Sequence, residues 1–330
     1  IGNTEKLHLQ TWRDFSKLKK INVGNILEEN TTVPSSIEKF EGKSRAYIEI
    51  QQGCDHRCTF CIIPYGRGNN RSVPAGEIIT KIKNFVKNGY NEVVLTGVDI
   101  TDYGKDLPAK PTFSNLIGRI LKLVPELKQL RLSSIDCAEI DIDFWDVLKD
   151  KRLMPHFHIS LQAGNNMILK RMKRRHSREM AIEFCKKVLS IRADATFGAD
   201  IIAGFPTETE EMFLDSIRLV DECQLTHLHV FPYSPRDKTP ASRMPQLDKN
   251  TIKERARRLR EKGFEKLEEN LKNKIGKKEL ILIENNKDNI SLGKDQNFIK
   301  VKIGEQIKEG KIISCIYTGI EGDTLLAKIA

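Results

Sequence analysis

Short β-prone runs recur along the first 231 residues of the chain, and the stretch between each pair is long enough for a helix. The runs lie at residues 45–51, 92–96, 129–133, 156–161, 197–203 and 226–231. Between them the apolar residues switch to helical spacing, as in Ile78, Ile82 and Phe85. Strands joined by helix-length crossovers pair in parallel with right-handed connections. The pattern therefore predicts an α/β fold, either an incomplete (β/α)6 barrel or an open doubly wound sheet.

The two ends of the chain depart from this rhythm. After Phe231, four prolines mark an irregular connection to a long charged helix from about Lys249 to Asn273. Short β-like runs with turn signals fill the remainder and predict a small OB-like β-barrel. At the start, one possible short helix, Glu5 to Lys19, precedes a polar stretch that ends in Pro34-Ser35-Ser36. We therefore expect a leading segment, a βα core and a terminal β-barrel, at residues 1–39, 40–270 and 271–330.

Composition limits the classes of partner. Lys and Arg number 55 against 45 Asp and Glu, which gives a formal net charge of +10 and a sequence pI of about 9.1. This basic excess favours a polyanionic partner. Charged residues make up 30% of the chain, and no apolar stretch is long enough to span a bilayer. The seven cysteines show no disulfide pattern, so we expect a reducing, cytoplasmic setting.

Polar or glycine-rich segments follow almost every predicted strand. They include Thr96-Gly97-Val98-Asp99, Ser133-Ser134-Ile135-Asp136, Gln162-Ala163-Gly164, Gly204-Phe205-Pro206 and Pro232-Tyr233-Ser234. In βα barrels and open α/β sheets the active site lies at this edge, so we expect these segments to surround one cavity. Turn chemistry alone also explains Gly, Ser and Pro at each single position.

Three cysteines stand close together directly after the first predicted strand, as Cys54-x3-Cys58-x2-Cys61. Structural zinc needs four closed ligands, usually as two pairs, and the chain has no second cysteine pair. An all-thiolate triplet suits a 4Fe-4S cluster with one iron free for another ligand. His56 is an alternative fourth ligand for zinc, although its place inside the short loop makes that set strained. Buried structural cysteines fit less well, because polar residues flank Cys58.

The cysteine motif, with aromatic Phe60 before its last cysteine, resembles that of the radical S-adenosylmethionine (SAM) superfamily. Longer segments narrow the resemblance to the methylthiotransferases, and within them to the MtaB type: GCDHRCTFCIIPYGRGNNRS, VVLTGVDITDYGKDL, HFHISLQAGNNMILKRMKRR, DIIAGFPTETEE and HVFPYSPRDKTPASRMPQ. The resemblance covers about residues 40–330. It implies an incomplete (β/α)6 radical SAM barrel with a C-terminal RNA-binding TRAM domain. It also implies the family's reaction, methylthiolation at C2 of N6-threonylcarbamoyladenosine at position 37 of tRNA.

The resemblance assigns roles to individual residues. Cys54, Cys58 and Cys61 would hold a 4Fe-4S cluster whose open iron binds SAM, and reduction would yield a 5′-deoxyadenosyl radical. Phe60 would lie near the SAM adenine, and Gly97 would let the backbone approach the methionine amine. Further candidates for contacts with SAM or substrate follow other strands: Ser134, Gln162, Gly204 and Tyr233.

The implied macromolecular partner is the anticodon loop of tRNA. A basic run is the candidate contact for the RNA backbone: Lys170, Arg171, Lys173, Arg174 and Arg175. Other arginines are candidates for phosphates or for the threonylcarbamoyl carboxylate, or else form a solvated basic face: Arg67, Arg71, Arg131 and Arg236. We expect a flavodoxin or ferredoxin as the reductant, and a monomer without membrane association.

The chain departs from the family pattern at its front. The family carries an N-terminal domain in which three further cysteines hold a second 4Fe-4S cluster, whereas no cysteine precedes Cys54 here. We therefore expect residues 1–39 to be the remnant of that domain and its linker, and this polypeptide to lack the second cluster. The remaining cysteines have no cluster spacing: Cys137, Cys185, Cys223 and Cys315.

Other functions stay open as alternatives. Related methylthiotransferases modify isopentenyladenosine in tRNA or an aspartate of a ribosomal protein. The former usually show Gly-Gln-Asn after the second strand, where this chain has Gly97-Val98-Asp99, which favours the threonylcarbamoyl substrate. A non-catalytic zinc or RNA-binding module is the alternative from a different class. Iron with sulfide would indicate the enzyme, and zinc alone would indicate the module.

Overall fold

The computed structural model describes residues 1–32 and 42–330, and parallel strands form its core. These strands are β1 (Arg45–Gln52), β3 (Glu92–Gly97), β4 (Gln129–Leu132), β5 (His156–Gln162), β6 (Thr196–Ala203) and β7 (Leu225–Pro232). Each lies where the sequence pattern predicts it. Parallel bridges, Leu130 to Leu153 and Ile135 to Ile159, connect the β1-β3-β4 sheet with the β5-β6-β7 sheet. The core is an incomplete (β/α)6 barrel, so the expected fold class is confirmed.

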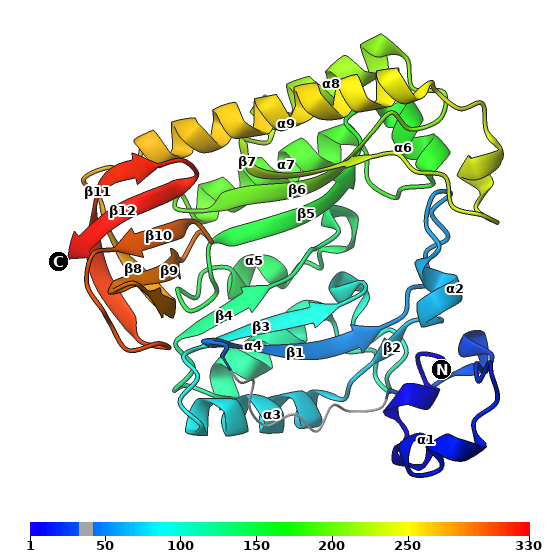
Figure 1. Ribbon diagram of the computed structural model, residues 1–330, viewed down its shortest axis with the longest axis horizontal. Coiled ribbons are helices and arrows are strands. Elements are labelled where there is room, and N and C mark those ends of the chain that lie inside the picture. The colour runs from blue at the N-terminus through cyan, green and yellow to red at the C-terminus, as the bar shows by residue number, and fades with distance from the viewer. Residues whose placement is uncertain (33–41) are drawn as a thin grey trace.

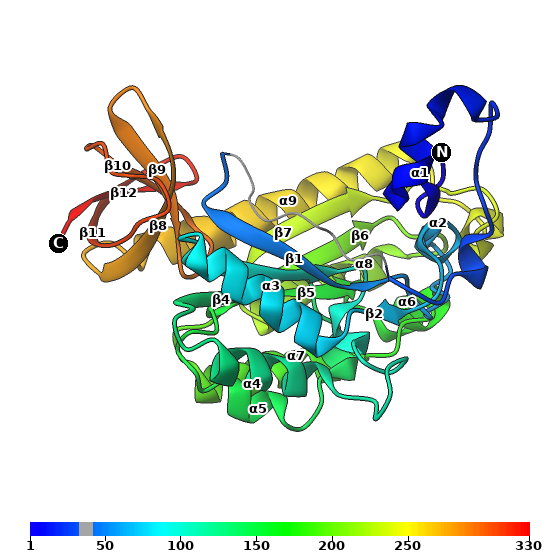
Figure 2. The ribbon, with the colours of Figure 1, turned by 90° about the horizontal axis from the view of Figure 1, so that it is seen from below.

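The barrel is open along one side (Figures 1 and 2). There β7 is an edge strand, and β1 is bordered on its outer side only by the two-residue strand β2 (Arg71–Ser72). Ile159 and Ile201 are fully buried, while the neighbouring His158 and Asp200 are partly exposed on the opposite face of the sheet. We call the space bordered by this inner face the lumen.

Helices cover the outer face of the sheets and connect the strands. They are α3 (Ala75–Lys87), α4 (Phe113–Leu123), α5 (Phe144–Val147), α7 (Arg178–Ile191) and α8 (Glu210–Glu222). Three of them begin at a hydroxyl side chain that accepts a backbone N–H of the first turn: Thr112, Ser177 and Thr209. In α3 the residues Ile78, Ile82 and Phe85 are at most 3% exposed, which fixes the apolar face against the sheet.

A separate closed barrel forms the C-terminus. It has the order β10-β12-β11-β8-β9, built from β8 (Lys278–Lys287), β9 (Ile290–Asp295), β10 (Lys300–Ile303), β11 (Ile312–Glu321) and β12 (Thr324–Ile329). This confirms the small β-barrel that the sequence predicts. The long helix α9 (Lys249–Lys272) crosses the molecule from the far end of the core to this barrel and packs on β7 (Figure 1). The expected charged helix is therefore also confirmed.

The C-terminal barrel closes the end of the lumen at which the parallel strands begin. Its Phe298 ring lies 4.9 Å from the Arg131 guanidinium and stacks on His156 with ring centroids 6.0 Å apart. Nearby, Asn297 donates to the carbonyl oxygens of Pro155 and Asp194, both at 2.9 Å. We call this end the floor of the lumen, and the opposite end, where the strands finish, the mouth.

The N-terminal segment lies at the mouth, beside α2 (Ile63–Arg67) (Figure 1). The prediction of a single helix from Glu5 to Lys19 is wrong. The segment instead forms short pieces: η1 (Glu5–Leu7), α1 (Leu9–Arg13), η2 (Phe15–Lys17) and η3 (Ile26–Glu28). His8 is extended, and Leu9 and Trp12 are 63% and 52% exposed, so too little apolar surface is buried to hold one helix.

The polar stretch expected to end in Pro34-Ser35-Ser36, and with it the expected boundary at residues 39 and 40, lies outside the described residues. None of the helices in the described part of the chain is both long and apolar enough to cross a membrane.

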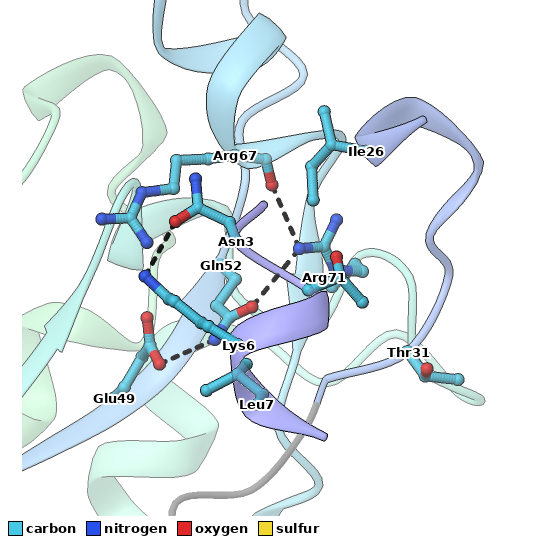
Figure 3. A pocket seen from close by; sticks show the side chains of 10 residues that line it. Asn3, Lys6, Leu7, Ile26, Thr31, Glu49, Gln52, Arg67 and Arg71 are labelled. Carbon is cyan, nitrogen blue, oxygen red and sulfur yellow. Dashed lines mark hydrogen bonds between the residues drawn. The ribbon is translucent and has the colours of Figure 1, made fainter. Parts of the chain in front are cut away.

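A cavity of about 230 Å³ separates the N-terminal segment from the core (Figure 3). Lys6 and Leu7 line it on one side, and Gln52, Arg67 and Arg71 line it on the other. The buried Arg71 side chain donates to Gln52 Oε1 at 3.3 Å and to the Arg67 carbonyl oxygen at 3.0 Å. The arginine thereby secures the start of β2 beneath the N-terminal segment.

Candidate active site

The three clustered cysteines lie on the loop between β1 and α2, at the mouth of the lumen. The backbone N–H of Cys54 donates to the Gly68 carbonyl at 3.0 Å, and that of Thr59 donates to the Met172 carbonyl at 3.0 Å. Gly53 enters the loop with φ +71°, and a Cβ there would lie 1.8 Å from the Asn69 carbonyl oxygen. The loop path therefore requires glycine at this position.

The loop encloses a cavity of about 160 Å³. Six residues that the sequence singles out line it together: Cys54, Cys58, Phe60, Cys61, Ser134 and Gln162. Gln162 ends β5 with φ +69°, a left-handed conformation that is costly for a residue with a side chain. The structure thus brings the ends of β1, β4 and β5 around one space, as strand-end convergence predicts.

Three other candidates do not line this cavity. A Cβ on Gly97 would lie 2.8 Å from the Gln51 carbonyl oxygen, so the glycine is required for packing against β1. Gly204, with φ +75°, faces Ile252 of α9, and a Cβ there would lie 2.7 Å from Ile252 Cγ1. Tyr233 is 7% exposed and packs edge-on against Phe205, with centroids 5.6 Å apart. Packing accounts for all three positions.

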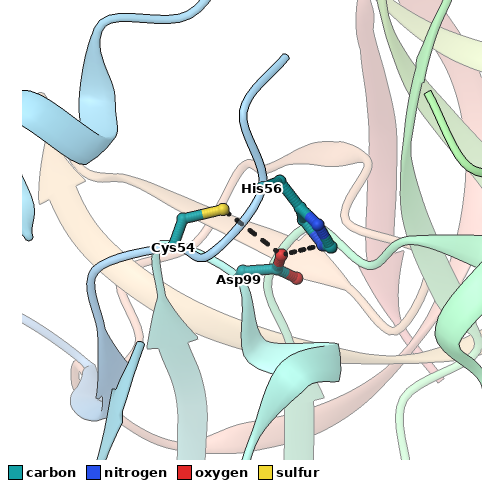
Figure 4. A group of neighbouring side chains, drawn as sticks. All are labelled: Cys54, His56 and Asp99. Atoms are coloured by element: carbon teal, nitrogen blue, oxygen red, sulfur yellow. Dashed lines mark hydrogen bonds and ion pairs between the residues drawn. The ribbon is translucent and has the colours of Figure 1, made fainter. Parts of the chain in front are cut away.

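An ion-pair network surrounds the cysteine loop. His56 Nε2 lies 2.9 Å from Asp99 Oδ2 (Figure 4) and 3.1 Å from Glu139 Oε1. Contact with these carboxylates raises the pKa of His56 to about 10. The Cys54 thiol contacts the same Asp99 oxygen at 3.7 Å. Asp99 and Glu139 thereby fix the loop from η4 (Ile100–Asp102) and η5 (Cys137–Glu139), which follow β3 and β4.

Arg174 contacts the cysteine loop from the other side. Its Nη2 donates to Asp136 Oδ2 and to the Ser160 carbonyl, both at 2.7 Å, and its Nη1 lies 3.8 Å from Cys58 Sγ. The side chain is only 8% exposed. Arg174 therefore stabilises negative charge on the Cys58 sulfur and fixes the loop to β5.

Gln51 connects two strand ends beneath the cavity and is fully buried. Its Oε1 accepts the backbone N–H groups of Val98 and Asp99 at 3.0 and 2.8 Å, and its Nε2 donates to the Gly53 carbonyl at 2.7 Å. One side chain thus sets the position of the β3 end relative to the cysteine loop.

The donor set fits a 4Fe-4S cluster better than zinc. Zn–S bonds of about 2.3 Å and Zn–N bonds of about 2.0 Å require four ligand atoms within about 4 Å of one another. In the described part of the chain, the ligand atoms of Cys54, His56 and Asp99 lie within 4.8 Å of one another, but this set has three members and includes only one of the three cysteines. Burial raises the pKa of the Cys54 and Cys61 thiols, so a metal centre would bind them with release of protons.

The basic run divides between the site and the surface. Lys170, Lys173 and Arg175 are exposed at the end of α6 (Asn166–Met172) and just beyond it, and the partly buried Arg171 donates to Thr207 Oγ1 at 2.8 Å. Arg174, expected with them as an RNA contact, is instead a buried residue of the cysteine cavity. Its carboxylate partner Asp136 and the cysteine sulfur account for that burial.

Three lining residues were missed by sequence reasoning: Ile63, Ser160 and, as a network residue, His56; Val98, Asp99 and Asp136 were expected only as members of strand-end segments. Val98, Asp99 and Asp136 belong to segments that follow strands, so the strand-end signal was present in the sequence. Ser160 lies inside β5, where period-two alternation alone places it toward the lumen.

Comparison with known proteins defines the class. The sequence pattern of the Radical SAM superfamily matches residues 48–220, which include the cysteine loop and most of the barrel. The chain belongs to the radical SAM superfamily.

Relatives define the family within that class. Threonylcarbamoyladenosine tRNA methylthiotransferase MtaB of Rickettsia prowazekii (strain Madrid E) is 53% identical over 322 residues, which is 97% of this chain and 75% of that protein. The protein of the same name from Aquifex aeolicus (strain VF5) is 33% identical, over 95% and 76%. A tRNA-2-methylthio-N(6)-dimethylallyladenosine synthase of Shouchella clausii is 36% identical, over 70% and 45%. The chain belongs to the MtaB family of threonylcarbamoyladenosine tRNA methylthiotransferases.

Proposed function

We propose that this protein is a tRNA methylthiotransferase that acts at C2 of N6-threonylcarbamoyladenosine, at position 37 of tRNA. The observation that carries the proposal is the 53% identity to the Rickettsia MtaB protein over 97% of the chain. The cysteine loop and its cavity supply the matching site. The relative named for dimethylallyladenosine is 36% identical over 70% of this chain, against 53% over 97% for the Rickettsia protein, which favours the threonylcarbamoyl substrate.

Membership of the radical SAM superfamily implies a 4Fe-4S cluster and SAM. Cys54, Cys58 and Cys61 would hold the cluster, and Phe60, Ser134 and Gln162 line the space beside them. When bound, these groups supply a one-electron cleavage of SAM and a 5′-deoxyadenosyl radical that removes hydrogen from an unreactive carbon. We infer one cluster for this polypeptide, because its other cysteines are buried and lie outside the loop: Cys137, Cys185, Cys223 and Cys315.

The protein's own residues contribute position, charge and exclusion of water. Arg174 holds the loop against β5 and balances thiolate charge at Cys58. Apolar Phe60, Ile63 and Val98 line the cavity and limit access of water to the reacting atoms. A low-potential donor such as flavodoxin or ferredoxin is the reductant we propose.

Two domains would serve catalysis and RNA binding. We propose a radical SAM core at residues 40–270 and a TRAM domain at 271–330, and the separate apolar cluster of buried residues from Leu271 to Ala327 supports this division. The exposed Lys170 and Lys173 lie at the mouth, next to the loop that Thr59 anchors, and are the proposed contacts for tRNA phosphates.

The test begins with anaerobic reconstitution using iron and sulfide. We expect about four irons per chain, and 5′-deoxyadenosine on reduction with SAM. The reduced protein is then mixed with tRNA that carries deuterium at C2 of the modified adenine. Transfer of deuterium from the threonylcarbamoyl substrate into 5′-deoxyadenosine supports the proposal. Transfer only from dimethylallyladenosine tRNA would favour the alternative substrate, and zinc without iron would refute the enzyme.

A further inference from the structure

Alternate residues of β5 line the lumen from floor to mouth. His156 stacks on Phe298 at the floor, while Ser160 and Gln162 line the cysteine cavity at the mouth. His158 lies between them on the same face of the strand. Two residues of a strand span about 6.6 Å, so His158 lies about that far below Ser160. The proposed function assigns nothing to this middle level.

Three strands contribute one side chain each at the level of His158. His158 Nε2 lies 2.9 Å from Asp200 Oδ1 of β6, and His229 Nδ1 of β7 lies 3.2 Å from the same oxygen. The parallel register pairs Asp200 with His229 directly. A Cβ on Gly198 would lie 2.5 Å from His158 Nδ1, so this glycine makes room for the imidazole. We call His158, Asp200 and His229 the lumen triad.

The triad has the donor set of a metal site, but its distances are those of hydrogen bonds. Two imidazole groups share one carboxylate oxygen at 2.9 and 3.2 Å, which satisfies that oxygen without an ion. Burial opposes ionisation of Asp200, yet the hydrogen bonds from both histidines outweigh it and lower the Asp200 pKa to about 2. Asp200 is therefore a carboxylate whose charge is already shared between two rings.

His229 is the member of the triad that is open to the lumen. Its side chain is 63% exposed, against 13% for His158 and 22% for Asp200. The hydrogen bond to Asp200 raises the pKa of His229 and occupies Nδ1. Nε2 has no hydrogen-bond partner within residues 1–32 and 42–330. With Nδ1 held by Asp200, the ring presents Nε2 to the lumen, and the raised pKa favours the protonated ring, in which Nε2 carries a hydrogen to donate.

We propose that His229, oriented by Asp200, binds the carboxylate of the threonylcarbamoyl group of the substrate. The inference rests on the proposed function and adds the residue that recognises the substituent on N6 of the substrate base. That carboxylate is the anionic group carried by the modified base, since the purine ring itself is neutral. A charge-assisted hydrogen bond from an imidazolium to a carboxylate is strong and directional. The arginines considered for this role include Arg131, which is instead bonded to Glu92 at the floor.

The spacing agrees with this assignment. With C2 of the adenine facing the cysteine cavity, the C6–N6 bond leaves the ring beyond N1 and diverges from the C2–H bond, so the N6 substituent extends to one side of the cavity. A carbamoyl linkage has peptide geometry, so the threonyl Cα lies about 3.8 Å beyond N6 of the adenine, and the carboxylate carbon about 1.5 Å further. This reach of about 5 Å is comparable with the distance of about 6.6 Å between successive same-face residues of a strand. A base held at the cysteine cavity would therefore extend its carboxylate by nearly one level of the strand, the separation between Ser160 and His158.

A binding experiment with two RNAs tests the contact itself. One anticodon stem-loop carries threonylcarbamoyladenosine, and the other carries its methyl ester, which is neutral. We expect the wild-type chain to bind the acid at least about tenfold more tightly than the ester. His229→Ala should bind both RNAs equally, with the affinity of the ester. His8→Ala, an exposed histidine of the N-terminal segment, is the matched control and should keep the tenfold preference.

Further readouts separate a local effect from misfolding and from failure of the proposed function. His229→Ala should still unfold in one cooperative transition and keep the wild-type circular dichroism spectrum. An acid preference that persists in His229→Ala, or that is absent from the wild type while both RNAs bind, overturns the inference and leaves the proposed function standing. If neither RNA binds the wild-type chain, both the proposed role of His229 and the proposed function are refuted.

Discussion

The floor and the mouth of the lumen are built on the same strands but use charge in opposite ways. At the floor, the first residues of β1 and β3 place Arg45 and Glu92 side by side, and Arg131 of β4 joins them. Glu92 is fully buried and accepts from Arg45 at 2.6 Å and from Arg131 at 3.0 Å. At the mouth, thiols, carboxylates and imidazole groups surround an open cavity.

The two ends differ in whether the polar and charged side chains find their partners within the chain or in a ligand that binds from outside. At the floor, the chain supplies the partners of Glu92 and Arg131, including two backbone carbonyls of the C-terminal barrel that accept from Arg131. At the mouth, the chain also pairs His56 and Arg174 with carboxylates, but the three cysteine thiols line the cavity and are the proposed ligands of a group that arrives from outside. The comparison indicates that floor residues govern stability and domain docking, whereas mouth residues govern chemistry.

The largest expected effect is at the mouth. Cys58→Ala should abolish both the cluster and SAM cleavage, because two thiolates do not hold the cubane. Cys185→Ala is the control, since Cys185 is buried in the outer core far along the chain from the loop. Iron content and 5′-deoxyadenosine are measured for both variants. If Cys58→Ala still cleaves SAM, the proposed role of the mouth residues in the chemistry is wrong.

The floor should show its largest effect in stability. Glu92→Gln leaves Arg45 and Arg131 buried without a carboxylate, and we expect a loss of about 3 to 5 kcal/mol in the free energy of unfolding. Urea denaturation measures it, with the exposed Glu254→Gln as a control whose midpoint should not move. SAM cleavage by the folded Glu92→Gln protein should match wild type. A normal midpoint would show that the floor charges are dispensable.

Low pH should destabilise the fold through the same Glu92 carboxylate. Burial opposes ionisation of Glu92, but Arg131 and Arg45 outweigh it and hold the Glu92 pKa below its ordinary value. A carboxyl with a lowered pKa contributes its full stabilisation above the unfolded value of about 4.3. That contribution is lost as the pH falls through the lowered value. The Glu92→Gln variant should therefore lose less stability than wild type over this range, because its side chain does not titrate.

The two ends also differ in what the sequence reveals. The strands, α9 and the C-terminal barrel were predicted at their observed positions because periodicity and turn residues are local signals. The three cysteines were predicted for the same reason. Arg131 and Arg174 were grouped with surface charges, yet both are buried, because their partners Glu92 and Asp136 lie 39 and 38 residues away in sequence. Such long-range pairing has no local pattern.

The lumen triad illustrates the same limit. His158 and His229 stand in apolar runs, where alternation predicts only that they share a face of the sheet. Their meeting on one oxygen of Asp200 depends on the register of β5, β6 and β7. The N-terminal segment shows the opposite error. Its sequence has a local helical pattern, but the predicted helix does not form because too little of its apolar surface is buried.

A smaller effect concerns Lys294 at the floor, whose Nζ lies 3.3 Å from the centroid of the Phe298 ring. Burial lowers the Lys294 pKa to about 8, with Arg45 and Arg131 acting in the same direction and Glu284 opposing them. The unfolded lysine has a pKa of about 10.4, so between these values the unfolded state binds more protons and stability rises with pH. Lys294→Met should remove this rise. Urea midpoints of both proteins at pH 7.5 and pH 9.5 measure it, and parallel pH profiles would contradict the assignment.

The smallest effect should come from the exposed lysines at the mouth. The Lys170→Gln/Lys173→Gln double variant removes two proposed phosphate contacts, so tRNA affinity should fall several-fold, with the slope of log K against log salt reduced by about 1.4 to 1.8. Lys83→Gln/Lys87→Gln on the outer helix α3 removes the same charge from another face and should leave the slope unchanged. Equal loss of slope in both double variants would mean that net charge, and not the mouth, attracts the RNA. A loss confined to the mouth pair would place the phosphate backbone beside the cysteine loop, where the modified base has to enter.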